Sequence, residues 1–403
     1  MINEYDVIIV GAGPAGLSTA FECSKAGLAV LLIEESDLIE TEKSWGTFPS
    51  TINNYPLIKK AITNTANRLK FYGAKESFDS DPTPIKGYFI EQSLMNNAYR
   101  AEINKFKNCR ILDKTLYQKA KRKNGYVEVQ TSQGMFTGKI IVDASGSYSV
   151  VANDLMMPDK KFWLFMCYFL RIHKKDALND YGCVVYSHGV TKTKSGSAAG
   201  ALYPNSKDYF DIGVANYLKS GQDTGEIKIE LKEQMVNLWS FFQKQKLIKE
   251  GVKIDFKKEF YGGIRVTPRK TICGDNIIIV GDAAGQGSPI TGEGLRTGLY
   301  YGEIAAKAII KAIRKNSYNK ASLELYPTLC KEKPLFGYDY GSIIQKLLRN
   351  NLATPPFRKF QKLCNSNNRH RKKYGLTLIR TLIQNDSISL KSAIKLLIKF
   401  YLS

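Results

Sequence analysis

The chain has 403 residues, which is long enough for two domains and a sizeable hydrophobic core. Its 59 Lys and Arg against 37 Asp and Glu give a formal net charge of +22, which suits an anionic partner or a lysine-rich solvated surface equally well. The seven cysteines are scattered without C-x-x-C spacing and the three histidines show no ligand spacing, which excludes a disulfide framework and a metal site as predictions.

A dinucleotide fingerprint opens the chain. The apolar run Tyr5–Val10 predicts a buried strand, and Gly11–Gly16 follows it with the pattern G-x-G-x-x-G. A helical pattern then runs to Gly27, where a helix should stop, and Val30–Ile33 predicts a second strand that closes on Glu34. Strand, glycine loop, helix, strand and acidic residue together predict a dinucleotide-binding unit.

Each residue type of the fingerprint has a physical role. Gly11 allows the tight turn, Gly13 lets the pyrophosphate approach, Gly16 lets helix and strand pack closely, and Glu34 is placed for the ribose hydroxyls. The cofactor-binding residues predicted here are Gly11, Gly13, Pro14, Ala15, Gly16, Glu34 and Glu35.

The next part of the chain predicts mixed structure. Glu35–Pro56 carries few helix or strand signals, Leu57–Asn67 indicates a short helix, and Arg68–Phe89 indicates strands and turns. Gln92–Phe106 has the apolar spacing of a helix.

A small antiparallel meander is predicted after this helix. It consists of Cys109–Leu116, Tyr126–Thr131 and Met135–Thr137, with Asn124-Gly125 as a hairpin turn. Ile140–Val142 then returns to the parallel sheet.

Residues 151–269 predict an inserted substrate domain. The expected elements are strands Phe162–Ile172, Gly182–Ser187, Gly196–Tyr203 and Tyr209–Ala215 and the helix Ile227–Ile248. The strands are rich in aromatic residues. A large apolar sheet facing a cofactor would suit a hydrophobic chain as substrate, and an ordinary sheet core has the same composition.

A second ligand element lies near residue 281. Ile277–Val280 predicts a strand buried on both faces, Gly281-Asp282 ends it, and Gly292–Gly294 opens a helical pattern to about Lys315. Unpaired N–H groups at a helix start favour negative charge, and a carboxylate at a strand end suits a polyol ligand. The predicted binding residues here are Gly281, Asp282, Gly292, Glu293 and Gly294.

The two elements together resemble a flavoprotein superfamily that includes aromatic hydroxylases, flavin halogenases, lycopene cyclases and geranylgeranyl reductases. The resemblance implies FAD, with Asp282 on the ribityl chain and the following helix start facing the isoalloxazine. Within the superfamily, Gly262–Val266, Gly281–Gly285 and Pro289–Gly294 are most similar to geranylgeranyl reductases, as are Gly200–Pro204 and Asp211–Ala215.

The chain departs from its relatives in several places. No cysteine lies between Cys23 and Cys109, so the Pro-x-x-Cys-Gly-Gly-like element of archaeal lipid reductases is absent. The phosphate-binding Arg that many relatives carry is replaced by Glu91 and Gln92. Asp143-Ala144 stands where hydroxylases have Asp-Gly, and no Arg follows. The candidate substrate contacts are Trp45, Tyr203 and Pro204.

The tail is basic and amphipathic. Its last apolar stripe consists of Leu390, Ile394, Leu397 and Tyr401, with Lys391, Lys395 and Lys399 alongside. Such a helix can lie on an anionic bilayer or pack on the protein, and the sequence leaves both open.

The sequence predicts an α/β protein with a Rossmann-type, discontinuous FAD-binding domain, an inserted β-sheet substrate domain and a helical C-terminal tail. The expected bounds are 1–70, 90–150 and 270–315 for FAD binding, 71–89 and 151–269 for substrate, and 316–403 for the tail. The start of the chain lacks signal-peptide features. We expect a cytoplasmic protein, with a peripheral position on the inner face of the membrane as an alternative.

The resemblance implies a flavin-dependent oxidoreductase that reduces C=C bonds of a hydrophobic or lipid isoprenoid substrate. NAD(P)H or a ferredoxin-like protein would be the electron donor, and no catalytic residue is identified. The alternatives are a flavin monooxygenase or halogenase for a small aromatic metabolite, a lycopene-cyclase-like enzyme without net redox change, and a flavin-binding scaffold on membranes. No nucleic-acid motif is present, so a nucleic-acid partner is not expected.

Overall fold

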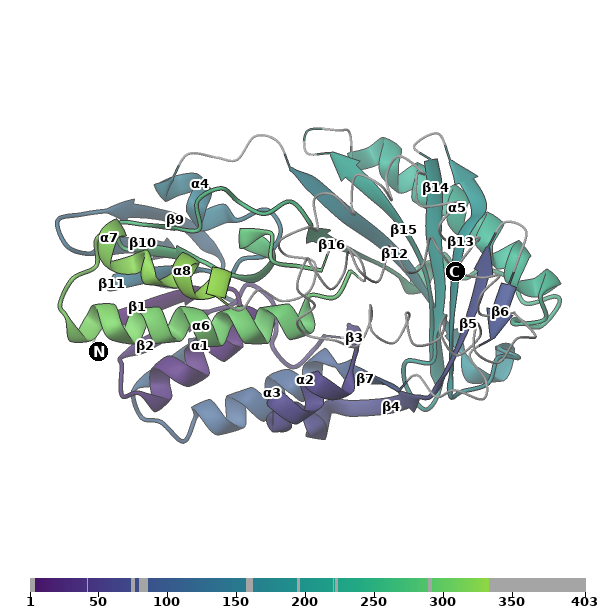
Figure 1. Cartoon of the computed structure of the whole chain (residues 1–403), viewed down its shortest axis with the longest axis horizontal. Helices are drawn as coiled ribbons and strands as arrows, with labels where there is room; N and C mark the ends of the chain where they lie inside the picture. The colour runs from purple at the N-terminus through teal and green to yellow at the C-terminus, as the bar shows by residue number, and fades with distance from the viewer. Residues whose placement is uncertain are drawn as a thin grey trace, which may run out of the picture.

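A computed structural model describes residues 4–332, except 42, 74–76, 80–85, 157–161, 194–195, 220, 222–223 and 289–291. The predicted amphipathic helix at 390–401 and most of the basic tail lie outside these residues. The described chain forms two sheet-based parts side by side (Figure 1).

The first part is built on a largely parallel sheet in the order β17-β18-β11-β1-β2-β8. The strands are β1 (Glu4–Val10), β2 (Val30–Ile33), β8 (Cys109–Leu112), β11 (Gly134–Asp143), β17 (Cys273–Gly274) and β18 (Ile277–Ile279). The middle of β1 is fully buried, as expected for a strand covered on both faces. The helices are α1 (Pro14–Lys25), α3 (Gln92–Ile103), α4 (Val150–Leu155), α6 (Leu295–Arg314), α7 (Lys320–Leu323) and α8 (Leu325–Glu332). The predicted Rossmann-type α/β fold is confirmed.

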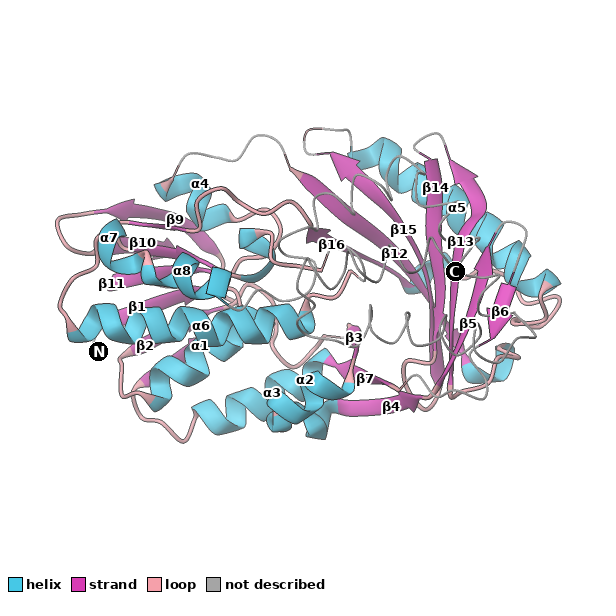
Figure 2. Cartoon of the chain, in the orientation of Figure 1, coloured by secondary structure: helices cyan, strands magenta, loops and turns pink. Residues whose placement is uncertain are grey.

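The second part is a seven-stranded sheet in the order β16-β12-β15-β14-β13-β5-β6. Its strands are β5 (Arg68–Gly73), β6 (Ser77–Asp79), β12 (Trp163–His173), β13 (Cys183–Thr193), β14 (Gly196–Tyr203), β15 (Tyr209–Lys219) and β16 (Glu259–Arg265). Helix α5 (Thr224–Lys244) covers one face of this sheet (Figure 2). Leu238 and Phe242 of this helix pack on the sheet. The opposite face, called the open face below, points toward the parallel-sheet part.

A three-stranded sheet joins the two parts. Its strands, in spatial order, are β3 (Ser44–Thr47), β7 (Gly87–Glu91) and β4 (Ile62–Ala66). Helix α2 (Pro49–Asn54) follows β3 in the chain. The segment Glu35–Pro56, for which few elements were predicted, therefore supplies a strand and a helix. The predicted helix Leu57–Asn67 is wrong beyond its first turns, because a short 3-10 helix, Pro56–Ala61, leads into strand β4.

The predicted meander also needs correction. β8 pairs with β2 in the parallel sheet, so it is not the first strand of the meander. β10 (Val127–Thr131) pairs antiparallel with β11, as predicted, and its other antiparallel partner is β9 (Tyr117–Arg122). β9 is an edge strand with exposed lysines, which protect an edge from further pairing but hide the apolar alternation of a strand. The hairpin turn at Asn124-Gly125 is confirmed, and β11 is one continuous strand.

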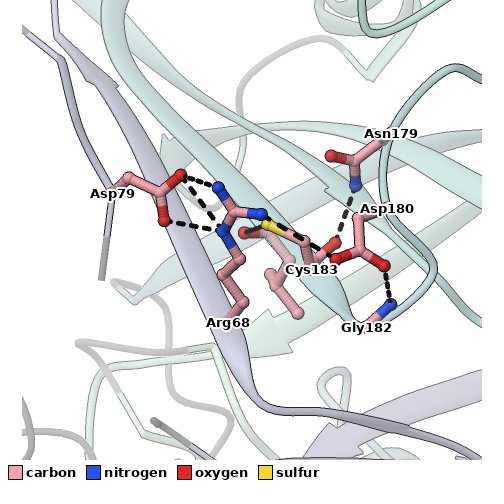
Figure 3. A network of polar contacts seen from close by, with 7 residues as sticks. Arg68, Asp79, Asn179, Asp180, Gly182 and Cys183 are labelled. Atoms are coloured by element: carbon pink, nitrogen blue, oxygen red, sulfur yellow. Dashed lines mark hydrogen bonds and ion pairs between the residues drawn. The ribbon is translucent and has the colours of Figure 1, made fainter. Parts of the chain in front are cut away.

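A polar network around Arg68 stabilises the β6 edge of the seven-stranded sheet (Figure 3). The guanidinium pairs with Asp79 on β6 and lies 3.9 Å from Asp180 in the loop before β13. Asp180 in turn accepts a hydrogen bond from the Gly182 amide at 3.0 Å. The network links β5 and β6 to β13, so this corner is held by charge as well as by strand pairing.

Helices α1 and α6 run parallel in close contact, although about 280 residues separate them. A Cβ on Gly302 would lie 2.4 Å from the Ala15 carbonyl oxygen, and one on Gly298 would lie 3.0 Å from Pro14 Cβ. Ser18 Oγ donates to the Leu299 carbonyl at 2.7 Å. Small residues allow this approach, and the N-termini of both helices consequently lie at the same end of the sheet.

We predict that Gly302→Ala lowers the free energy of unfolding by about 1–3 kcal/mol, because the added methyl overpacks the helix contact. In an exposed helix the same change would be stabilising by about 1 kcal/mol, so the sign separates packing from helix propensity. Denaturant unfolding measures the effect, and Lys311→Ala on the exposed side of α6 is the control. A stabilised Gly302→Ala protein would contradict the close contact.

Candidate functional site

The three fingerprint glycines differ in what surrounds them. Gly11 has φ +100°, and a Cβ there would lie 2.3 Å from the Ala144 carbonyl oxygen. A Cβ on Gly16 would lie 1.9 Å from the Gly11 carbonyl oxygen. A Cβ on Gly13 would meet no atom within 4 Å, and its φ of −68° suits any residue. Gly11 and Gly16 therefore serve the turn and its packing, whereas Gly13 leaves an open space at the N-terminus of α1.

Glu34 follows β2 and is fixed against the glycine loop. Its Oε2 accepts a hydrogen bond from the Ala12 amide at 2.7 Å, and its Oε1 accepts one from the Ser36 amide at 3.0 Å. The carboxylate thus lies beside the space at Gly13, where the fingerprint requires it. The neighbouring Glu35 is exposed.

The second ligand element meets the first at the start of α1. Gly281 has φ +63°, and a Cβ there would lie 2.8 Å from Ala15 Cβ. The turn Gly281–Ala284 that follows β18 is therefore held against the glycine loop, as the combined motif predicts. Ala15 makes this contact with Gly281, whereas Pro14 contacts Gly298 on α6.

The Asp282 carboxylate faces the start of α6. Its Oδ1 lies 3.2 Å from the Cβ position of Gly287 and 3.4 Å from that of Gly294. None of the residues that the structure describes donates a hydrogen bond to it or pairs with it. Desolvation by burial raises the pKa of Asp282 to about 7. An inward-facing carboxylate without a donor is what a polyol ligand would satisfy.

The turn before α6 holds its own shape. Gly292 has φ +66°, and its amide donates to the Ser288 carbonyl at 3.0 Å. The Ser288 amide donates to the Glu293 carbonyl at the same distance. Pro289–Thr291, which belong to the predicted motif, lie outside the described residues.

The Glu293 side chain turns into the protein, so only its main chain can serve the predicted cofactor contact. Its carboxylate accepts from Thr47 Oγ1 at 2.7 Å and pairs with Arg296 at 3.2 Å, and both charged side chains are about 95% buried. Thr47 Oγ1 also lies 2.7 Å from Thr51 Oγ1, and Arg296 lies over the Phe48 ring at 5.6 Å. This buried cluster fixes β3 and α2 against the start of α6, and nothing in its sequence spacing indicated it.

The candidate substrate residues lie around the junction of the sheets. Trp45 is on β3, half-buried and packed against the core of the first part. Tyr203 is on the open face, with ring centroids 6.1 Å from Phe89 and 5.7 Å from Tyr186. The Pro204 carbonyl accepts a hydrogen bond from Asn64 at 2.7 Å, so it is occupied within the protein.

One of these phenols is kept protonated by its surroundings. Desolvation by burial raises the pKa of Tyr203 well above its usual range. The Tyr203 hydroxyl is consequently neutral and can donate a hydrogen bond.

The segment after β11 is closed on itself. The fully buried Asp143 carboxylate accepts from the Ser145 amide and hydroxyl at 3.1 and 2.6 Å, from the Ser149 hydroxyl at 2.7 Å and from the Ala152 amide at 2.8 Å. The hydrogen bonds that the Asp143 carboxylate accepts therefore come from the segment that directly follows it.

The described residues meet the requirements of neither a metal site nor a membrane-spanning helix. Within the described ranges, no three His, Cys, Asp or Glu side chains gather as a metal ion would require. None of the helices described is both long and apolar enough to cross a membrane.

The residues fit FAD. The space at Gly13 and the adjoining α1 N-terminus suit a pyrophosphate, and Glu34 lies beside them for the ribose. The Asp282 carboxylate would be available as an acceptor for a ribityl chain, and the flavin edge would lie at the turn from Gly292 to Gly294, which leads into α6.

The chain is similar to known proteins in sequence and in fold. The family model described as pyridine nucleotide-disulphide oxidoreductase matches residues 8–163. Digeranylgeranylglycerophospholipid reductase of Methanococcus vannielii is 27% identical over 375 residues, which cover 87% of this chain and 89% of that protein.

Solved structures share the fold over nearly the whole chain. A geranylgeranyl bacteriochlorophyll reductase-like protein from Thermoplasma acidophilum has a TM-score of 0.75 at 18% identity and covers 100% of this chain and 98% of its own. A flavin-dependent brominase has a TM-score of 0.69 at 17% identity, with 99% of each chain covered. The chain is an FAD-dependent oxidoreductase, and its predicted resemblance to geranylgeranyl reductases is confirmed.

We predict that Gly13→Val abolishes FAD retention, because the side chain would fill the open space at the start of α1. The residue's backbone is unstrained, so the variant should fold, with a thermal midpoint near that of the FAD-free wild type. Flavin absorbance after gel filtration measures retention. A folded variant that keeps a full complement of FAD would contradict the placement.

Asp282 should make the stability of the FAD-free protein depend on pH. Its pKa is raised from 3.8 to about 7 in the fold, so the folded state holds a proton that the unfolded state has lost between these values. Stability therefore falls as pH rises through this window, by up to about 1.4 kcal/mol per pH unit. Asp282→Asn should remove this dependence, and denaturant unfolding at pH 5 and 7.5 compares the two. A constant wild-type–variant difference would refute the assignment.

Proposed function

We propose that this FAD-dependent oxidoreductase reduces C=C bonds in an isoprenoid chain carried by a lipid or another hydrophobic molecule. Reduced FAD, when bound, supplies the hydride from its N5 atom. The protein contributes the orientation of the double bond and the exclusion of water.

The observation on which the proposal rests is that the open face, with its aromatic side chains, adjoins the turn Gly292–Gly294 before α6, which we call the flavin turn. A Cβ on Gly292 would lie 3.0 Å from the Phe165 ring, and one on Gly287 would lie 2.4 Å from Ile264. Apolar side chains of the second sheet thus reach the residues that lead into α6. The names of relatives that match most of the chain give independent support, since they are reductases of digeranylgeranyl lipids.

The proposed roles follow from this arrangement. Gly13, Glu34, Asp282 and Gly294 would hold FAD, whereas Trp45 and Tyr203 would border the substrate. We assign FAD binding to residues 1–70, 90–150 and 270–315 and substrate binding to 71–89 and 151–269. We place the protein in the cytoplasm, where the basic tail would contact an anionic membrane that holds the lipid substrate.

The second candidate is a monooxygenase or halogenase for a small aromatic metabolite. The fold shared with a flavin-dependent brominase keeps this candidate in view. The two reactions differ in their need for oxygen, and a lycopene-cyclase-like reaction differs from both because it changes no oxidation state in the substrate.

We predict that the dithionite-reduced protein adds two hydrogens per step to a geranylgeranyl lipid under strict anaerobiosis. Mass spectrometry of the extracted lipid measures the gain, with Gly13→Val as the control that lacks the cofactor. Product that contains one added oxygen, and forms only in air, would replace the reductase with the monooxygenase. Isomerised product of unchanged mass would indicate the cyclase-like reaction.

The same assay compares electron donors. The Asp143 loop satisfies its own carboxylate and carries no Arg, unlike the hydroxylase element linked to NAD(P)H use. We expect NADPH to reduce the flavin more slowly than dithionite or a ferredoxin-like protein does.

A further inference from the structure

Side chains at one level of the open face are small across four neighbouring strands. Gly262 on β16 is opposite Cys167 on β12, Cys167 is opposite Ala215 on β15, and Ala215 is opposite Ala199 on β14. We call this row the trough floor. Strands lie about 4.8 Å apart, so the floor crosses the sheet for about 14 Å.

Larger side chains flank the trough floor on β12 and β16, two residues along each strand, whereas β14 has Ala201 at the corresponding level. On β15 the flanking residues are Tyr217 and Gly213, and the Phe169 ring lies 2.5 Å from the Cβ position of Gly213. On the side of the flavin turn, the rings of Phe165 and Tyr217 have centroids 5.2 Å apart. On the other side, Phe169 and Phe260 stack with centroids 5.0 Å apart. A level two residues away lies about 7 Å along the strand, so the floor and its two aromatic walls form a shallow trough.

The position of the trough restricts what can occupy it. The sheet stands between α5 and the parallel-sheet part, and the trough lies on the face that looks toward that part (Figure 1). The wall containing Phe165 contacts the Cβ position of Gly292 in the flavin turn. An occupant must therefore be thin, apolar and within reach of the flavin, which suits an extended hydrocarbon chain better than a protein partner.

Gly262 is the feature that the fold itself does not explain. Its φ lies outside the left-handed region, and a Cβ there would meet no atom within 4 Å. A glycine inside a strand lowers stability and often marks a place where a ligand approaches closely. Its neighbour Gly263 faces the other side of the sheet, where a Cβ would lie 2.8 Å from Met166 Sδ.

We infer that the trough holds an extended prenyl chain and that Gly262 is a specificity-determining residue whose missing side chain leaves room for it. The inference rests on the proposed function, because it names the place of that function's substrate. Gly262 acts by space alone, since it offers no group for chemistry.

The test is a titration of the oxidised FAD-loaded protein with geranylgeraniol and with the shorter geraniol, followed by the change in flavin absorbance. Gly262→Leu should retain FAD and keep or raise the thermal midpoint. It should weaken geranylgeraniol binding by at least about 10-fold, because a single methylene-sized change in a hydrophobic pocket is already worth about 10–200-fold and Leu adds four carbons. The affinity for geraniol, which fills less of the trough, should fall by a smaller factor. Gly262→Ala should reduce the affinity for geranylgeraniol less than Gly262→Leu does.

Gly263→Ala is the matched control, because it adds a methyl group at the next residue on the opposite face. The flexible end of Met166 can shift to make room for this methyl group, so the variant should keep its thermal midpoint and leave the preference for geranylgeraniol unchanged. Unchanged geranylgeraniol binding by Gly262→Leu, or no binding by the wild type, would overturn the trough. Loss of FAD from Gly262→Leu would also overturn it and assign the position to the cofactor. Wild-type binding without anaerobic hydrogen addition would reject the proposed function alone.

Discussion

The contact between α1 and α6 is the constraint on which the rest of the structure depends. Gly298 and Gly302 bring α6 against the first turns of α1, and Ser18 bonds to its backbone. Two helix N-termini consequently share one end of the parallel sheet, and each presents unpaired N–H groups there. The glycine loop, the Gly281 turn and the helix start at Gly294 converge only because this contact is so close.

The sequence predicted the parts of the site that are formed by backbone. Gly11, Gly13 and Gly281 follow buried strands, and their spacing fixes both the turn and the helix that follows it. Long apolar strands such as β12 were also predictable, because their pattern is continuous over many residues. β9 was missed because alternating lysines on an edge strand look like an exposed loop.

The sequence could not predict contacts between distant side chains. Thr47 and Glu293 are 246 positions apart, and each residue type is common in loops and helix starts. Their buried cluster, which includes Arg296, appears only when β3 is folded against α6. The trough floor could not be predicted from the sequence either, because Ala199, Ala215 and Gly262 align only through strand register.

The order of the strands also bears on how the chain folds during synthesis. β1 lies between β2 and β11 in the parallel sheet. β18, which pairs with β11 on its other side, comes after all strands of the second sheet in the sequence. The contact face of α1 stays uncovered until residues beyond Gly302 have left the ribosome. Closing such long loops slows folding and exposes apolar surface meanwhile. The first part can therefore close only after most of the chain has been made, although its glycine loop is among the first segments synthesised.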